Sequence, residues 1–142
     1  MRNFKLKYSN SRHYERDIEF GILVELNKVG FFWKVDYAGQ LVNGVWRRNK
    51  SVFAVSGMPD IQGVINGYKP FFFEVKTPEE YKKIVKNWDK YKTAPFSASK
   101  NIKRYQRQIL TIERLRNNGC VAEFIYNKDQ ALDFIKGGKI NV

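Results

Sequence analysis

The stretch 60–76 constrains the fold more than any other part of this sequence. It reads DIQGVINGYKPFFFEVK, so that two apolar runs meet across the dipeptide Asn66-Gly67. Asn-Gly between apolar runs is a strong signal for a β-hairpin, because both residues tolerate the positive φ angles that a tight two-residue turn requires. We therefore predict two antiparallel strands, at residues 60–65 and 68–76, joined by a tight turn.

Apolar spacing and end signals predict the remaining elements. Apolar residues recur at steps of three and four in two long segments, where helices are expected. Another helix begins after Thr77, which suits an N-cap, with Pro78 at the first helical position and Glu80 three residues after the cap. The elements predicted outside the hairpin are helix 13–29, strand 31–37, helix 77–91, helix 99–117, strand 120–126 and helix 128–136.

This order of elements predicts an α/β fold in which a mixed central sheet is flanked by helices on both faces. Residues 40–57 give no clear pattern beyond an extended segment followed by a basic patch. The length of 142 residues fits one compact domain over residues 1–142. Residues 1–12 are expected to form a basic N-terminal arm.

The composition indicates the kind of partner. Twenty-six Lys and Arg residues against 14 Asp and Glu give a net charge of +12, which attracts polyanions such as nucleic acid. No apolar run is long enough for a membrane span, and the first residues lack the apolar stretch of a secretion signal. The single cysteine, Cys120, excludes a disulfide within the chain. We expect a cytoplasmic protein that binds nucleic acid and has no membrane contact.

Charged residues gather at one end of the predicted hairpin. Because side chains alternate along a strand, Glu74 and Lys76 point to one face and Val75 points to the other. Pairing of the two strands brings Asp60 alongside this end. Two carboxylates held so closely repel each other unless a cation neutralises them. Mg²⁺, which binds carboxylates and water, suits this position and phosphodiester substrates.

These residues resemble the motif of the PD-(D/E)xK nuclease superfamily, which has a restriction-endonuclease-like three-layer fold. Pro59-Asp60 and Glu74-Val75-Lys76 carry the resemblance, and their setting, GMPDIQGVINGYKPFFFEVKTP, is similar to the VRR-NUC branch and to RecU-type and archaeal Holliday-junction resolvases. The resemblance implies that Asp60, Glu74 and the Val75 carbonyl bind Mg²⁺, for which Mn²⁺ substitutes. It also implies that Lys76 positions or activates the attacking water.

The same resemblance implies a glutamate on the first helix and a glutamine on the helix after the motif. Glu19 lies in the apolar stripe of the first helix and eleven residues before Gly30, as in the archaeal resolvases, and it is a further candidate catalytic residue and metal ligand. Glu15, one turn earlier, is the alternative. For the glutamine, the spacing to the end of the helix favours Gln108, and an alignment to RecU favours Gln106.

One segment departs from the family pattern. In many VRR-NUC sequences the glutamine helix follows the Glu-x-Lys closely, whereas here residues 79–98 lie between them. This segment is a candidate for substrate contacts or for a dimer surface. The residues expected to contact DNA are Arg47, Arg48, Lys50, Lys100, Lys103, Arg104 and Arg107.

The expected function is that of a Mg²⁺-dependent, structure-selective DNA endonuclease of the Holliday-junction resolvase type, acting in recombination and repair. Such an enzyme is expected to work as a homodimer, and its small size would suit a bacteriophage or its host. One alternative keeps the fold and changes the substrate, giving a nickase, a flap nuclease or a restriction-type endonuclease. A second alternative is a basic DNA-binding module without catalysis.

Overall fold

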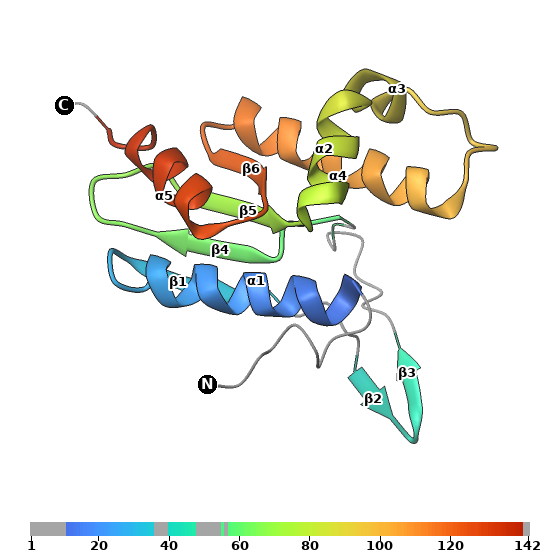
Figure 1. Ribbon diagram of the computed structural model, residues 1–142. Coiled ribbons are helices and arrows are strands. Elements are labelled where there is room, and N and C mark those ends of the chain that lie inside the picture. Colours follow the sequence, from blue (N-terminus) through green and yellow to red (C-terminus); the bar gives the residue numbers. More distant parts are fainter. Residues whose placement is uncertain (1–10, 36–39, 48–54, 56, 141–142) are drawn as a thin grey trace.

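The computed structural model describes residues 11–35, 40–47, 55 and 57–140, and the account below is confined to them (Figure 1). The elements, in chain order, are α1 (Ser11–Leu26), β1 (Phe31–Lys34), β2 (Gln40–Val42), β3 (Val45–Arg47), β4 (Ile61–Val64), β5 (Phe71–Val75), α2 (Pro78–Lys86), α3 (Trp88–Lys92), α4 (Lys100–Asn117), β6 (Val121–Ile125) and α5 (Lys128–Lys136).

The centre of the described fold is a four-stranded sheet in the order β1-β4-β5-β6. The pairs β1–β4 and β4–β5 are antiparallel, and the pair β5–β6 is parallel. Figure 1 shows α1 and α5 on one face of this sheet and α2 and α4 on the other. The prediction of a mixed sheet with helices on both faces is confirmed.

Each face of the sheet carries its own apolar core. On the α1 and α5 side, Phe71, Phe73 and Val75 of β5 are fully buried together with α1 residues such as Ile22. On the opposite side, Ile109 and other buried residues of α4 pack with α2, α3 and β6. The alternation along β5 therefore directs every second side chain into a different core.

The β4–β5 connection differs from the predicted two-residue turn. Gly63 is paired with Phe71, so residues 64–70 form a longer connection. Asn66-Gly67 does form a turn within it, in which the Tyr68 N–H donates to the Ile65 carbonyl at 3.0 Å, but of this dipeptide only Gly67 has a positive φ, 82°. The prediction of a tight hairpin was wrong here.

The C-terminal segment gives the physical reason for this longer connection. The Lys69 N–H donates to the Gly138 carbonyl at 2.8 Å, and the Ile140 N–H donates to the Gly67 carbonyl at 2.9 Å. Tyr68 also forms an isolated antiparallel bridge with Lys139. Backbone groups that a tight hairpin would pair internally are therefore paired with residues 138–140 instead.

A tight Asn-Gly hairpin occurs elsewhere, in the region whose pattern was unclear. β2 and β3 pair in the register Val42 to Val45, which leaves Asn43-Gly44 as a two-residue turn. Both residues have positive φ, 51° for Asn43 and 77° for Gly44, as a type I′ turn requires. Figure 1 shows this small hairpin standing apart from the main sheet.

Two predicted helices end or break earlier than expected. α1 ends at Leu26 because the Asn27 side chain accepts the Phe32 N–H at 3.0 Å and donates to the Leu23 carbonyl at 3.0 Å, which starts the turn into β1. The helix predicted over 77–91 breaks at Asn87, whose φ of −111° and ψ of 24° are not helical. The Thr77 cap is confirmed, since its Oγ1 accepts the Glu80 N–H at 3.3 Å.

The last three elements match their predictions closely. α4 is capped by Ser99, β6 follows Gly119 with its φ of 84°, and α5 covers the predicted residues. Among the described helices, none combines the length and the apolar content needed to cross a membrane.

Candidate active site

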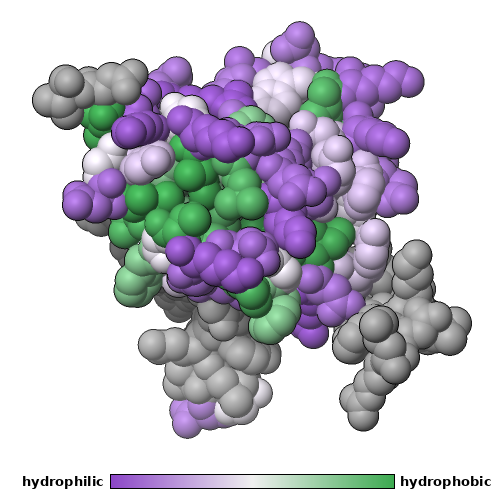
Figure 2. All heavy atoms as spheres, turned by 60° about the vertical axis from the view of Figure 1, so that its left-hand side comes forward, coloured by the Kyte–Doolittle hydropathy of each residue, from purple (hydrophilic) through white to green (hydrophobic). Residues whose placement is uncertain are grey.

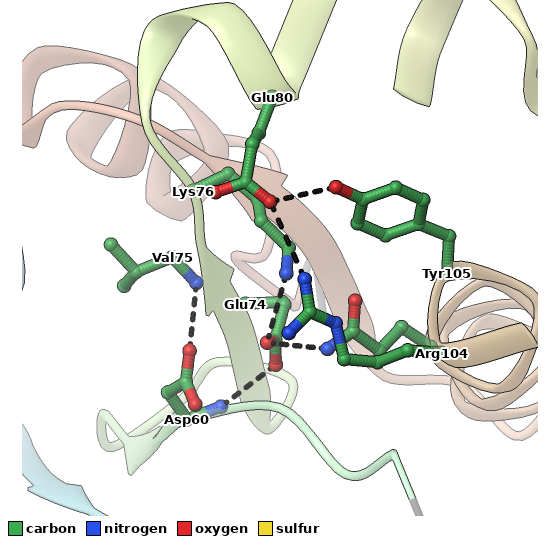
Figure 3. A network of polar contacts seen from close by, with 8 residues as sticks. Asp60, Glu74, Val75, Lys76, Glu80, Arg104 and Tyr105 are labelled. Carbon is green, nitrogen blue, oxygen red and sulfur yellow. Dashed lines mark hydrogen bonds and ion pairs between the residues drawn. The ribbon is translucent and has the colours of Figure 1, made fainter. Parts of the chain in front are cut away.

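The β4–β5 register places two carboxylates side by side at the start of β4 and the end of β5. Ile61 pairs with Phe73, so Asp60 and Glu74 are the next pair along the two strands. The Asp60 N–H donates to Glu74 Oε2 at 3.2 Å, and the Val75 N–H donates to Asp60 Oδ2 at 3.1 Å (Figure 3). The predicted meeting of Asp60 and Glu74 is thus present. The Val75 side chain, as expected, faces the opposite core.

Lys76 lies on the same face as Glu74. Its Nζ is 3.8 Å from Glu74 Oε1, and its side chain is 4% exposed. Its ammonium also lies 5.4 Å from the centre of the Tyr105 ring on α4. A buried ammonium beside a carboxylate and an aromatic face is held in place with little access to bulk water.

Of the two candidate glutamines, Gln108 reaches the acid pair. Gln108 Nε2 donates to Glu74 Oε1 at 3.0 Å, and Gln108 Oε1 is buried without a hydrogen-bond partner among the described residues. Gln106 lies elsewhere, with its Nε2 donating to the carbonyls of Lys92 and Ala94 at 3.0 Å each. The Gln108 oxygen is thus an acceptor at the edge of the site to which none of the residues described by the structure donates.

The electrostatics of the pair favour a bound cation. The pKa of Glu74 is held well above its ordinary value of 4.5, first by burial and then by the negative charge of Asp60, while Lys76 acts in the opposite direction. A cation between the two carboxylates would offset both unfavourable causes at once. Without one, a proton has to take that place.

The donor set fits a hard divalent ion that keeps part of its water. In the described part of the chain, no three Asp, Glu, His or Cys side chains are gathered closely enough to hold a metal ion by themselves. Mg²⁺ does not require such a cage, because it is commonly held by one or two carboxylates together with waters and substrate oxygens. Asp60 and Glu74 supply the two carboxylates, and the strand backbone at Val75 lies between Glu74 and Lys76.

The two α1 glutamates both line the cavity in front of Asp60, with different partners. This cavity has a volume of about 500 Å³ and is lined by Glu15, Arg16, Glu19, Lys34, Asp60, Glu80 and Arg104. Glu19 is buried and its Oε1 forms an ion pair with Lys34 Nζ at 3.0 Å.

Glu15 is the α1 glutamate coupled to the acid pair. Its pKa is raised from 4.5 to about 7, chiefly by burial; the positive charge of Lys76 lowers it, whereas Glu80 and Asp60 raise it further. A carboxyl group that titrates near neutral pH exchanges protons readily at the pH of a cell. The preference for Glu19 rested on its place in the apolar stripe and on its spacing to Gly30, and Glu19 lines the same cavity as Asp60.

Two residues at the rim of the site, Glu80 and Tyr105, were missed as site residues by sequence reasoning. Tyr105 Oη donates to Glu80 Oε2 at 2.9 Å, and Arg104 Nη2 lies 3.7 Å from the same oxygen (Figure 3). Glu80 matched a helix-capping pattern and Tyr105 matched a core face, so neither pattern pointed to the site. Arg104 was expected to contact DNA, and it lines the cavity.

The other residues expected to contact DNA are distributed unevenly. Lys100 and Arg107 are exposed on α4, and Lys103 is half-buried beside them. Arg47 ends β3, but its side chain, like Arg48 and Lys50, lies outside the described residues, as do residues 1–10 of the predicted arm. Among the residues expected to contact DNA, those whose side chains are described therefore lie on the first half of α4.

Comparison of this chain with family models, with curated proteins and with solved structures found no significant match. The case for the site therefore rests on the contacts among Asp60, Glu74, Lys76 and Gln108 and on their burial.

Proposed function

We propose that this chain is a divalent-metal-dependent endonuclease that hydrolyses phosphodiester bonds in branched DNA, in the manner of a Holliday-junction resolvase with a restriction-endonuclease-like fold. One observation carries the proposal. Asp60 and Glu74 are paired at a strand end with the Lys76 ammonium 3.8 Å from Glu74, and both Glu74 and Lys76 are buried. Buried charges are costly to stability, which favours a ligand site over a structural ion pair.

Mg²⁺, or Mn²⁺ in its place, would be held by Asp60 and Glu74, with the Val75 carbonyl as a third donor. When bound, the ion supplies a Lewis acid that lowers the pKa of water and offsets negative charge on the phosphate.

The chain's own residues supply the positioning. Gln108 fixes the orientation of Glu74 through its 3.0 Å hydrogen bond, and Lys76 is placed to orient the attacking water. In the reaction, the water oxygen bonds to phosphorus, the bond to the 3′ oxygen breaks, and that oxygen takes up a proton. The products are a 5′-phosphate and a 3′-hydroxyl.

The charge distribution supports DNA as the substrate. The net charge is +12, and the exposed cations of α4 lead directly to Arg104 at the cavity. Lys and Arg that neutralise phosphates supply most of the affinity for a nucleic-acid backbone. Arg104, now 3.7 Å from Glu80, is within reach of an anion that enters the cavity.

A homodimer suits this substrate, because a four-way junction needs two symmetric cuts. Apolar surface is available for a second copy: Phe31 of β1 is 65% exposed, and Trp33 and Val64 are exposed beside it in the paired strands β1 and β4. Figure 2 brings forward the left-hand side of the molecule as seen in Figure 1 and shows apolar surface gathered there within a hydrophilic border.

A cleavage assay with purified protein tests the proposal. Four-way junction, flap, nicked and linear DNA are incubated with Mg²⁺, and the parent is compared with Asp60→Asn and Lys76→Ala. We expect the parent to cut the junction in preference to the duplex and both variants to bind DNA without cutting. Asp133→Asn and Lys136→Ala are matched controls, because these residues form an exposed ion pair on α5, away from the site. Equal cutting by Asp60→Asn and Asp133→Asn would contradict the site assignment. The absence of cutting by the parent would contradict the proposed endonuclease activity.

A further inference from the structure

The loop between α3 and α4 carries the most exposed large apolar side chain among the described residues. Phe96 is 93% exposed, in the sequence Thr93-Ala94-Pro95-Phe96-Ser97. Figure 1 shows this loop projecting from the molecule at the N-terminal end of α4. An aromatic ring so exposed adds nothing to a core, so it invites a search for a partner outside the protein.

The loop is braced in the position that exposes the ring. Gln106 Nε2 donates to the carbonyls of Lys92 and Ala94, which fixes the start of the loop to α4. The Ala98 N–H donates to the Pro95 carbonyl at 2.9 Å, which closes a turn with Phe96 at its first central position. Ser99 Oγ accepts the Ile102 N–H at 3.3 Å and anchors the end of the loop. A braced loop presents the ring at a low entropic cost on binding.

The surroundings of the ring are cationic. Lys103 Nζ lies 4.2 Å from the centre of the Phe96 ring, and Lys90 and Lys100 are exposed on the neighbouring helices. An aromatic ring among lysines matches the face of a nucleobase beside a phosphate backbone, where the ring stacks and the cations neutralise phosphates. A single ring offers too little apolar area to hold the protein on a membrane.

Successive residues of α4 connect the ring with the cavity in front of the acid pair. Lys103, which contacts Phe96, is followed directly by Arg104, which lines the cavity with Asp60. Consecutive Cα atoms lie about 3.8 Å apart. Two neighbouring residues of one helix therefore contact the ring and line the cavity.

We propose that Phe96 is a wedge that stacks on unpaired or unstacked bases and so directs cleavage to branched DNA; this inference rests on the proposed endonuclease. Inserting an apolar side chain between base steps requires the bases to unstack. The energy cost of unstacking is smallest where the stack is already interrupted. A branch point or a flap base is such a place, and continuous duplex is not. The wedge therefore gives structure selectivity without reading sequence.

The test measures base unstacking separately from cleavage. A four-way junction and a linear duplex each carry 2-aminopurine, at the branch point or at the duplex centre, and are mixed with the full-length protein in buffer without divalent ions. The proteins compared are the parent, Phe96→Ala, and Phe20→Ala as the matched control, since Phe20 on α1 is also 70% exposed. The same proteins are then assayed for cleavage with Mg²⁺.

We expect the parent and Phe20→Ala to raise the fluorescence of the branch-point probe and Phe96→Ala to lose most of that rise. Phe96→Ala is also expected to bind the junction about tenfold more weakly, the order of one lost base-stacking contact, with duplex binding unchanged. Gln106→Leu, which releases the start of the loop, is expected to fall between the two. The activity of Gln106→Leu on linear duplex should remain that of the parent.

The outcomes separate the two proposals. If the parent cuts DNA and Phe96→Ala shows the same junction preference and the same fluorescence rise as the parent, the wedge is overturned and the endonuclease is retained. A fluorescence rise that depends on Phe96 without any cutting overturns the endonuclease and supports the wedge as a binding device. Binding of Phe96 to anionic lipid vesicles, with no effect of Phe96→Ala on DNA, overturns the wedge in favour of a membrane contact.

Discussion

The two faces of β5 differ in chemistry where the strand ends. On one face, Phe71, Phe73 and Val75 are fully buried in the core beneath α1 and α5. On the other, Glu74 is 4% and Lys76, just past the strand end, 3% exposed. Burying apolar surface stabilises a fold, whereas burying charge opposes it. One strand therefore separates the residues that hold the fold together from those that prepare a site.

Phe73→Ala tests the apolar face and is expected to have the largest effect. Removing this fully buried ring leaves a cavity, so the free energy of unfolding should fall by about 3–5 kcal/mol. Urea denaturation measures the loss, with Phe20→Ala as an exposed control whose change should stay within about 0.5 kcal/mol. A loss below about 1 kcal/mol, which is close to the effect of a surface substitution, would contradict the comparison.

Glu74→Gln tests the polar face. Cleavage with Mg²⁺ should fall by about 10²–10³-fold, as for the loss of a group that stabilises developing charge. Stability without metal should be retained or increased, because the variant removes the carboxylate that burial and Asp60 both disfavour. The comparison is made by measuring cleavage and urea denaturation on the same samples, with Glu79→Gln on the exposed side of α2 as control. A destabilisation as large as that of Phe73→Ala would show that Glu74 is structural.

The two glutamines of α4 test which neighbours of the polar face matter for cleavage. Gln108→Leu removes the hydrogen bond to Glu74, and cleavage should fall by about ten- to a hundredfold, the range for a hydrogen bond to a charged group. Gln106→Leu leaves Glu74 untouched and should keep activity on linear duplex near that of the parent. Cleavage rates at saturating Mg²⁺ decide the matter, and equal losses in the two variants would contradict the separation of roles.

The smallest expected effect is on the pH dependence of stability. The Glu15 pKa is about 7 in the folded protein against 4.5 ordinarily, so the folded state binds more protons between these values. The free energy of unfolding should therefore fall as pH rises through this window, and the raised pKa of Glu74 acts in the same direction. In metal-free denaturation series, Glu15→Gln should have a shallower slope than the parent. A slope equal to that of the parent would contradict the coupling of Glu15 to the site.

Local patterns predicted the sheet and the core of the site because those depend on alternation and pairing within a short stretch. Asp60, Glu74 and Lys76 lie within one β4–β5 unit, so the pairing of neighbouring strands predicted that they meet. The predicted two-residue turn would have placed Asp60 opposite Phe73, and the longer connection sets the observed register of Ile61 with Phe73. The Gln108 assignment needed a distant helix, and the spacing argument chose between two neighbours on it. Glu15 and Glu19 lie one helical turn apart, and only the packing of α1 against the strand end distinguishes them.

The two Asn-Gly dipeptides show where local reasoning stops. Asn43-Gly44 forms the two-residue turn that the dipeptide favours, with positive φ at both residues. Asn66-Gly67 has the same chemistry, but residues 138–140 hydrogen-bond to its neighbourhood and hold it in a wider connection. A contact from more than seventy residues away overrides the local preference. The break at Asn87 is similar, since α3 turns aside to pack on α4.

The pairing of Asp60 with Glu74 has a consequence for measuring this protein. A slip of one residue between β4 and β5 would turn Asp60 toward the opposite face and separate the two carboxylates. Misregistered chains would thus be silent in any assay of the site while remaining visible to measurements of total protein or helix content. Activity per mole of chain is then a readout of folding fidelity, because only molecules with the native strand pairing are counted.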